Sequence, residues 1–466
     1  MDWLRGRWSR LPRFARAVVM NLLIGLAIEA VLLALHGSRL MVSIEDAGLD
    51  WMIGMYAATP PVGRRPAIPF TVLDIDDDTY RVWGEPLLIP RDKLLALIRF
   101  AVDRGAKLVI VDVDLSRSSD PAQDRALSEY LEWRKPGQEV GGAHSPRPDA
   151  RVVPIIFIRT FHAPPGRDGA RQARASILDG ILDSAPGVYM SAPLFEMDRD
   201  LAIRRWRLWE PTCGSRFGDV VPSVQLLMLM LSVSQPAGMD ETLLPVRRYA
   251  CRYRLGTAAA GPYDGRVQVG PVWLSLDQPH LRRRIVYTLP WKLGGYPTVS
   301  TEGHRTPVLI SLPAYVVSET PAAVSAEAVA GRAVIIGGSF ADGRDVYATP
   351  LGPMPGAWVI VNAVQSLLQF GELRYPPAWV KLFVLAGVIV LVSVLFAWLR
   401  SFFAMLACGV IILVLLLPAS LWLFRAGVWL EFAIPLLAVL GHHLYDQVEE
   451  AKHAGIRASS HLGARS

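Results

Sequence analysis

Aspartates gather in two short stretches of this chain, and they are its clearest candidates for binding chemistry. They lie in VLDIDDDTY and in VIVDVDL, at Asp74, Asp76, Asp77, Asp78, Asp112 and Asp114. Several carboxylates in one place repel one another unless a cation, an arginine or a bound proton compensates. The pattern indicates a site for a ligand or a metal ion. The alternative, for at least half of them, is a role as ordinary turn and helix-capping residues.

The neighbouring segments predict that both acidic groups lie at one edge of a parallel sheet. Residues 70–75 and 108–113 are short apolar runs rich in β-branched residues, which is typical of buried strands. Residues 91–102 have apolar side chains at helical spacing, so we expect a crossover helix between the two strands. Open α/β sheets bind ligands outside the carboxyl ends of their strands. Arg91, at the start of that helix, is therefore a candidate ligand-binding residue too.

A third core strand is expected at residues 333–336, followed by the glycine-rich turn GGSFADGRD and an apolar helix over about 356–370. Ser339, Asp342 and Asp345 in this turn are further candidate ligand-binding residues. GGSFA superficially resembles the nucleophile elbow of serine hydrolases. However, Ala341 replaces the second glycine, and the helix does not follow the strand directly, so we do not expect a hydrolase serine here.

The remainder of the middle region predicts more elements of an α/β fold. We expect a helix at 121–133, strands at 151–159, 187–190, 201–209 and 284–289, and a buried helix at 221–233. Residues 235–278 are weakly patterned and are expected to be irregular or an insertion. Arg204, Arg205 and Arg207 either meet the acidic strand ends or protect a solvated edge strand.

The composition indicates a membrane protein with a soluble middle. The chain has 466 residues, of which 52% are hydrophobic and only 19% charged, and the apolar excess is concentrated at the two ends. The net charge of +6 comes largely from arginines beside the apolar segments, and no nucleic-acid-binding motif is present, so we expect no nucleic acid partner. The expected regions are a basic N-terminus at 1–16, spans at 17–35, 379–399, 402–424 and 428–445, an α/β domain at 36–378 and a tail at 446–466.

The arginines before the first span predict that the N-terminus is cytoplasmic and that the domain after it lies outside. Four spans then return the C-terminus to the cytoplasm, in the inner membrane of a bacterium. Cys213 and Cys251 fall in the exported region and either form a disulfide or remain two unrelated thiols, whereas Cys408 lies within a span.

Three motifs and their order resemble the second class of CHASE sensors. They are VLDIDDDTY, IPRDKLLALIRFAVDRGAKLVIVDVDL and GRAVIIGGSFADGRDVYATPLGPMPG, with one apolar segment before them and three after them. The resemblance implies an extracytoplasmic α/β sensor domain with a mostly parallel sheet, joined to a helical membrane region. Two positions depart from the family pattern: Leu88-Ile89-Pro90 replaces a Trp-Pro-type motif, and Ile360-Val361 replaces a His-Ala pair. Members commonly continue into an output domain, whereas residues 446–466 are too few to form one.

These observations favour a sensor, not an enzyme, that detects an envelope signal or a ligand and passes it to a separate partner or through a homo-oligomer. A scaffold subunit of an envelope complex is the alternative. A metal-dependent hydrolase built on Asp74, Asp76, Asp112 and Asp114 is the third hypothesis. No organic cofactor is expected, and the sequence leaves the ligand open.

Overall fold

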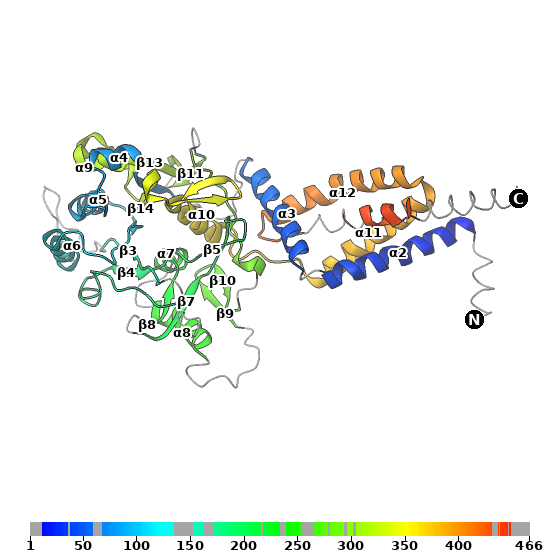
Figure 1. Ribbon diagram of the computed structural model, residues 1–466, viewed down its shortest axis with the longest axis horizontal. Helices are drawn as coiled ribbons and strands as arrows, with labels where there is room; N and C mark the ends of the chain where they lie inside the picture. The colour runs from blue at the N-terminus through cyan, green and yellow to red at the C-terminus, as the bar shows by residue number, and fades with distance from the viewer. Residues whose placement is uncertain are drawn as a thin grey trace, which may run out of the picture. The chain divides into compact units, whose positions relative to one another are not determined.

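The computed structural model describes residues 12–35, 38–58, 68–134, 152–162, 171–215, 218–233, 239–252, 265–277, 280–292, 296–301, 304–430, 437, 439–445 and 447–448. The chain divides into two compact units, one formed by residues 53–373 and the other by 1–52 with 374–466. Figure 1 shows the elements of both units.

A six-stranded parallel sheet forms the centre of the first unit. Its strands, in spatial order, are β13 (Leu309–Pro313), β1 (Phe70–Ile75), β14 (Ala333–Gly338), β2 (Leu108–Val111), β3 (Ile155–Ile158) and β4 (Val188–Ser191). All residues of β1, β2 and β3 are buried, as the unbroken apolar runs predict for strands covered on both faces. The predicted strands β1 and β2 are parallel, but β14 lies between them, so they are not neighbours.

Helices cover both faces of this sheet. On one face, α5 (Arg91–Asp103), α6 (Pro121–Trp133) and α9 (Ala314–Glu319) pack against alternate residues of the strands in one apolar core. The short helix α4 (Asp77–Val82) follows β1 directly. The other face is met by the long helix α10 (Gly356–Gln369), which is buried from its first residue to Leu367. The predictions of helices at 91–102, 121–133 and 356–370 are confirmed.

Short two-stranded sheets and further helices complete this unit. The strand pairs are β5 (Phe195–Met197) with β6 (Ile203–Trp206), β7 (Trp209–Ser215) with β8 (Gly218–Pro222), β9 (Arg266–Val269) with β10 (Val272–Ser275), β11 (Thr298–Thr301) with β12 (His304–Pro307), and β15 (Val346–Thr349) with β16 (Gly352–Pro355). The helices are α7 (Val224–Val233) and α8 (Met239–Ala250). The prediction that residues 235–278 are irregular is wrong, because α8, β9 and β10 lie there.

The predicted strand at 284–289 is also wrong, although its residues are buried. One bridge joins Arg284 to Arg205 of β6, and the Ile285 amide donates to the Arg204 carbonyl at 2.9 Å, but side chains of α10 bond the backbone beyond that point. The amides of Thr288 and Leu289 both donate to Oδ1 of Asn362 at 2.9 Å, and the amide of Val286 donates to Oγ of Ser366 at 2.9 Å. Buried backbone groups must find partners, and here polar residues of a helix supply them.

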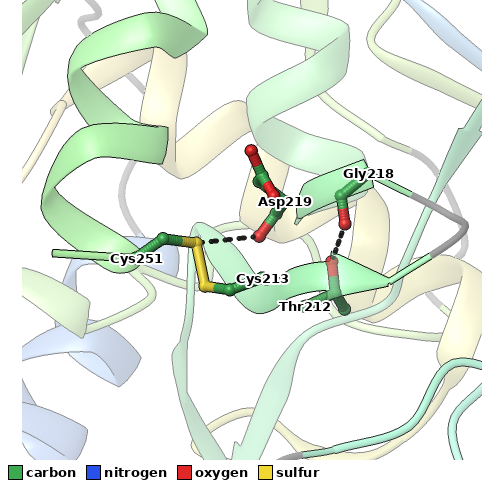
Figure 2. Close-up of a disulfide and its surroundings, with 5 residues drawn as sticks. All are labelled: Thr212, Cys213, Gly218, Asp219 and Cys251. Atoms are coloured by element: carbon green, nitrogen blue, oxygen red, sulfur yellow. Dashed lines mark hydrogen bonds between the residues drawn. A yellow bond between two sulfur atoms is a disulfide. The ribbon is translucent and has the colours of Figure 1, made fainter. Parts of the chain in front are cut away.

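Cys213 in β7 and Cys251 after α8 form a disulfide, with their Cα atoms 5.6 Å apart (Figure 2). Nearby, the Thr212 hydroxyl donates to the Gly218 carbonyl at 2.8 Å and joins β7 to β8. A cross-link between residues 38 apart in sequence stabilises a fold by roughly 2–4 kcal/mol through the unfolded chain. The sequence had left this pairing open.

Within the described residues, the second unit has three helices that are long and apolar enough to span a membrane: α2 (Arg13–Leu35), α11 (Ala378–Trp398) and α12 (Ser401–Phe424). A Cβ at Gly25 of α2 would lie 3.2 Å from Ile389 of α11, so these two helices pack closely. They correspond to three of the four predicted spans. The fourth, at 428–445, falls partly outside the described residues, so its prediction is not confirmed. The helix α3 (Arg39–Ala57) follows α2 in sequence.

Candidate functional site

The candidate site lies where the three central strands of the sheet reach their carboxyl ends. Asp74 of β1 is the register partner of Gly337 in β14. The amide of Asp112 donates to the carbonyl of Ile336 at 2.8 Å, so Asp112 follows β2 beside the same glycine. A Cβ at Gly337 would approach the Cβ of Ala357 to 2.9 Å, and its absence allows α10 to start close to β14. The two acidic groups thus share one edge of the sheet, as predicted.

Asp112 and Asp345 form a pair of interacting carboxyl groups at this edge. Both are half-buried, and burial raises the pKa of each, with the charge of Asp345 further raising the pKa of Asp112. Hydrogen bonds from Tyr347 and from the Gly356 amide act in the opposite direction on the pKa of Asp345. A Cβ at Gly356 would collide with the Asp345 carboxylate, so glycine is required at the start of α10. The pair therefore favours taking up one proton.

Asp74 is a second perturbed acid, with a side chain only 8% exposed. Burial raises its pKa to about 7; interaction with Ser339 lowers it, and the charges of Asp76 and Asp77 raise it. Its Oδ1 atom has no hydrogen-bond partner among the described residues. A buried carboxyl oxygen without a partner is costly, especially when charged, so this group gains from a proton or a donor.

The next acids of the first group have structural partners. Asp76 is the N-cap of α4 and accepts from the Thr79 amide at 2.8 Å, as the capping alternative predicted. Asp77 accepts from the Ala341 amide at 2.8 Å, which fastens the loop after β14 to the start of α4. Asp342 lies in that same loop and is exposed. Because β1 ends at Ile75, Asp76 lies outside the strand that carries Asp74.

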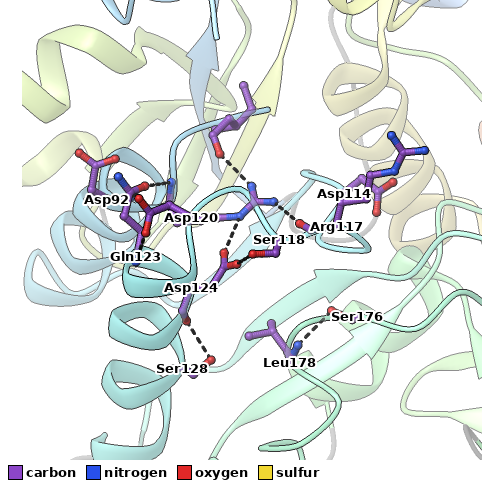
Figure 3. A network of polar contacts seen from close by, with 12 residues as sticks. Asp92, Asp114, Arg117, Ser118, Asp120, Gln123, Asp124, Ser128, Ser176 and Leu178 are labelled. Atoms are coloured by element: carbon purple, nitrogen blue, oxygen red, sulfur yellow. Dashed lines mark hydrogen bonds and ion pairs between the residues drawn. The ribbon is translucent and has the colours of Figure 1, made fainter. Parts of the chain in front are cut away.

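Arg91 and Asp114 organise the loop after β2. Arg91 is 1% exposed and donates to the carbonyls of Ile89 and Arg117 at 2.8 and 3.1 Å. It also lies 3.4 Å from Asp124, whose carboxylate accepts from Ser118 (Figure 3). Both oxygens of Asp114 accept from Ser116, one from its amide at 2.8 Å and one from its hydroxyl at 3.0 Å. Arg91 therefore positions this loop from within, and Asp114 closes a local turn.

The arginines at 204–207 pair with nearby acids of their own region. Arg204 and Arg205 bind Asp198 at 3.1 and 2.5 Å, and Arg207 binds Glu210 at 2.7 Å. The hypothesis that they meet the acidic strand ends receives no support from these contacts. Arg205 is also only 3% exposed, so it does not protect a solvated edge.

The predicted metal site is not formed by the described part of the chain. No three His, Cys, Asp or Glu side chains there are grouped so as to hold a metal ion. Asp76 and Asp114 accept hydrogen bonds in a helix cap and in a local turn instead. What the edge offers instead is a pair of interacting carboxyl groups with raised pKa values and a further buried acid, which suit cations and hydrogen-bond donors.

Sequence reasoning missed the residues that surround the Asp112–Asp345 pair and the interaction between its two members. Asp345 was a candidate, but its charge interaction with Asp112 joins segments more than 200 residues apart, and Tyr347 and Gly356 were not singled out. The only signal was the glycine at the start of an otherwise apolar helix, which indicates close approach by another group.

A family model described as the CHASE2 domain matches residues 23–398 of the chain. The match takes in the whole sheet, both acidic groups and the glycine-rich turn, and it ends with the last residue of α11. Neither the curated proteins nor the solved structures gave a match. The matched range covers most of the chain, and its fold agrees with the expected parallel α/β architecture. The protein therefore belongs to the CHASE2 family of sensory domains.

Proposed function

We propose that this protein is a sensor of the bacterial inner membrane whose α/β domain lies outside the cytoplasm. The signal acts on the Asp112–Asp345 pair, and the response passes through the membrane helices to a separate signalling partner. The protein works in this proposal as a receptor and not as an enzyme. The family, the apolar helices and the Cys213–Cys251 disulfide support it, since disulfides persist in oxidising compartments.

The observation that carries the proposal is the unneutralised pair of Asp112 and Asp345. Neither carboxylate forms an ion pair with a Lys or Arg among the described residues, and burial raises the pKa of both. Two charged carboxylates repel each other there, whereas a proton or a cationic ligand between them removes the repulsion. In this proposal the repelled and the neutralised pair favour two states of the domain, and the signal shifts the balance between them.

The helix α10 connects this pair to the end of the domain. It starts at Gly356 against Asp345 and remains buried to Leu367. Phe370, directly after α10, packs edge-on against Tyr56 near the end of α3, with ring centroids 5.5 Å apart. A short segment then leads in sequence to α11. A displacement of the first turn of α10 is therefore expected to shift the whole helix. This shift would reach the end of α3 and the segment that leads to α11, which are the two connections to the membrane helices.

Hydrogen exchange at two pH values tests this mechanism. Protonation is favoured at lower pH, so ionisation of both carboxyl groups as the pH rises from 5 to 8 should loosen the first turn of α10. After correction for intrinsic exchange, the protection factors of residues 356–377 should fall by about tenfold in the full chain in detergent micelles. This is the change in equilibrium constant that corresponds to one unit of pKa. Asp112→Asn and Asp345→Asn should each abolish most of this response.

The matched control is Asp114→Asn, an exposed carboxylate at the same edge that serves a local turn. It should leave the pH response of residues 356–377 unchanged. An equal response in the wild type and in both pair variants would show that Asp112 and Asp345 do not control α10, and the proposed signal site would be wrong.

Thiol labelling in intact cells tests the orientation of the domain. Glu129 is exposed on α6, so Glu129→Cys in a Cys408→Ser background should react with a membrane-impermeant maleimide before lysis. Cys213 and Cys251 should resist alkylation until they are reduced. Ser459→Cys in the predicted cytoplasmic tail should react only after lysis. Labelling of Glu129→Cys only after lysis would place the domain in the cytoplasm and contradict the proposal.

A further inference from the structure

A separate cavity opens at the carboxyl ends of β2 and β3, away from the carboxyl pair. Its volume is about 430 Å³, within the range of small-molecule pockets, and its lining residues are Ser116, Arg117, His162, Ala173, Arg174 and Ala175. Three of these side chains are basic or carry ring nitrogens, one is a hydroxyl, and none is acidic. The position is the one at which α/β sheets bind ligands.

The backbone around this cavity is held firmly. Phe161 and Ala173 form an antiparallel bridge, flanked by hydrogen bonds from the His162 amide to Gln172 at 2.8 Å and from the Arg174 amide to Thr160 at 2.9 Å. On the other side, buried Arg91 donates to the carbonyl of Arg117 at 3.1 Å. The two arginines that line the cavity are therefore presented by loops whose main chains are already fixed.

The charged ends of these arginines are left without counter-ions. Neither Arg117 nor Arg174 forms an ion pair within the described residues, and Nε of Arg174 is buried without a hydrogen-bond partner there. Two acids in the adjoining segments bind other groups: both oxygens of Asp114 accept from Ser116, and Asp179 binds Arg159 at 2.5 Å. A buried guanidinium N–H without an acceptor is costly, and an oxyanion would satisfy it.

We propose that this pocket binds a small oxyanion, a phosphate monoester or a dicarboxylate, through Arg117 and Arg174, with a hydrogen bond from the His162 ring. The planar fork of each guanidinium matches two oxygens of a phosphate or carboxylate group. This site goes beyond the proposed function, because oxyanion binding here does not depend on how the Asp112–Asp345 pair behaves. The two proposals can therefore fail separately.

Isothermal titration calorimetry on the full chain in lipid nanodiscs tests the pocket. The probes are inorganic phosphate, glycerol 3-phosphate and succinate at 150 mM NaCl, where weak surface attraction is largely screened. At least one probe should bind saturably with one site per chain. Arg174→Ala and Arg117→Ala should each weaken binding at least tenfold, and Arg174→Lys should weaken it less, because it keeps the charge but loses the fork.

Two further variants separate recognition from folding. Ala175→Glu adds a negative charge to the lining without removing an arginine and should weaken binding at least tenfold. Arg99→Ala removes an exposed arginine on α5, whose guanidinium lies 4.9 Å from the Tyr130 ring, and should leave binding unchanged. The melting temperature of each variant reports whether it is folded.

The lipid composition of the discs distinguishes a free anion from a lipid headgroup. Weaker probe binding in phosphatidylglycerol discs than in phosphatidylcholine discs, with the difference lost in Arg174→Ala, would support the pocket with a headgroup as its occupant. Equal, arginine-dependent binding in both would support a soluble ligand. The proposal is overturned if no probe binds saturably in either disc, or if Arg117→Ala, Arg174→Ala and Ala175→Glu all bind like the wild type.

Discussion

Replacing Asp74 with Asn should remove a loss of stability of about 4 kcal/mol that the wild-type α/β domain undergoes between pH 4 and pH 8. Burial raises the pKa of Asp74 from 3.8 to about 7, so the folded state binds more protons than the unfolded state between these values. The wild type therefore loses stability as the pH rises through this window, at about 1.4 kcal/mol per unit of pKa. Asn cannot ionise and escapes this loss.

Chemical denaturation of the full chain in detergent micelles, followed by tryptophan fluorescence between pH 4 and pH 8, measures the difference. The comparison across pH cancels any pH-independent cost of fitting an amide beside Ser339. Asp92→Asn, at an exposed position in the first turn of α5, is the matched control. Parallel stability curves for Asp74→Asn and the wild type would show that the Asp74 carboxyl is not held protonated by burial.

The raised pKa of Asp74 is also relevant to the proposed sensing function. Asp74 lies in β1 and Asp112 directly follows β2, the two strands that flank β14, whereas Asp345 lies in the segment after β14. A raised pKa opposes ionisation at each of these carboxyl groups. At neutral pH the unliganded domain thus keeps carboxyl groups at an edge that disfavours their charge. A ligand that donates hydrogen bonds or positive charge recovers this free energy on binding. Strain of this kind at one edge is typical of a functional surface, because a purely structural edge would gain from neutral residues.

The sequence predicted the local elements well where one physical signal dominated. Residues 121–133 combine a capping Asp120, a proline at the first helical position and helical spacing of apolar residues, and α6 has the same bounds. Unbroken apolar runs likewise located β1 and β2. The runs could not show that β14, more than 200 residues later, inserts between them, because pairing partners leave no mark on a short buried strand.

The errors have equally local causes. Residues 284–289 have the composition of a strand but are satisfied by Asn362 and Ser366, and no pattern within the segment reveals partners on a distant helix. The hairpin of β9 and β10 is marked by alternation over four residues and by Gly270 at φ +55°, signals too short to stand out in a weakly patterned region. The candidate acids fall into two groups. Asp76 and Asp114 serve a helix cap and a local turn, which sequence patterns can indicate, whereas Asp112 interacts with the charge of the distant Asp345.

The second large effect is expected at Asp124, which lies outside the candidate acids. Asp124 is 8% exposed, and its Oδ1 lies 3.4 Å from Nε of Arg91, itself 1% exposed. Asp124→Ala leaves the Arg91 guanidinium buried without this counter-ion. Removing one partner of a buried ion pair destabilises a protein by roughly 3–5 kcal/mol. Denaturation of the full chain in detergent micelles should show a loss of this size.

A matched pair of variants separates this effect from the simple loss of a surface contact. Asp78 and Arg81 form an ion pair at 2.8 Å in which both side chains are more than 60% exposed, so Asp78→Ala should cost less than about 1 kcal/mol. Equal losses at Asp78 and Asp124 would contradict the role given to Arg91. Because Arg91 also holds the carbonyl of Arg117, Asp124→Ala should weaken oxyanion binding, whereas Asp78→Ala should not. The buried ion pair would then prove to support the binding loop as well as the fold.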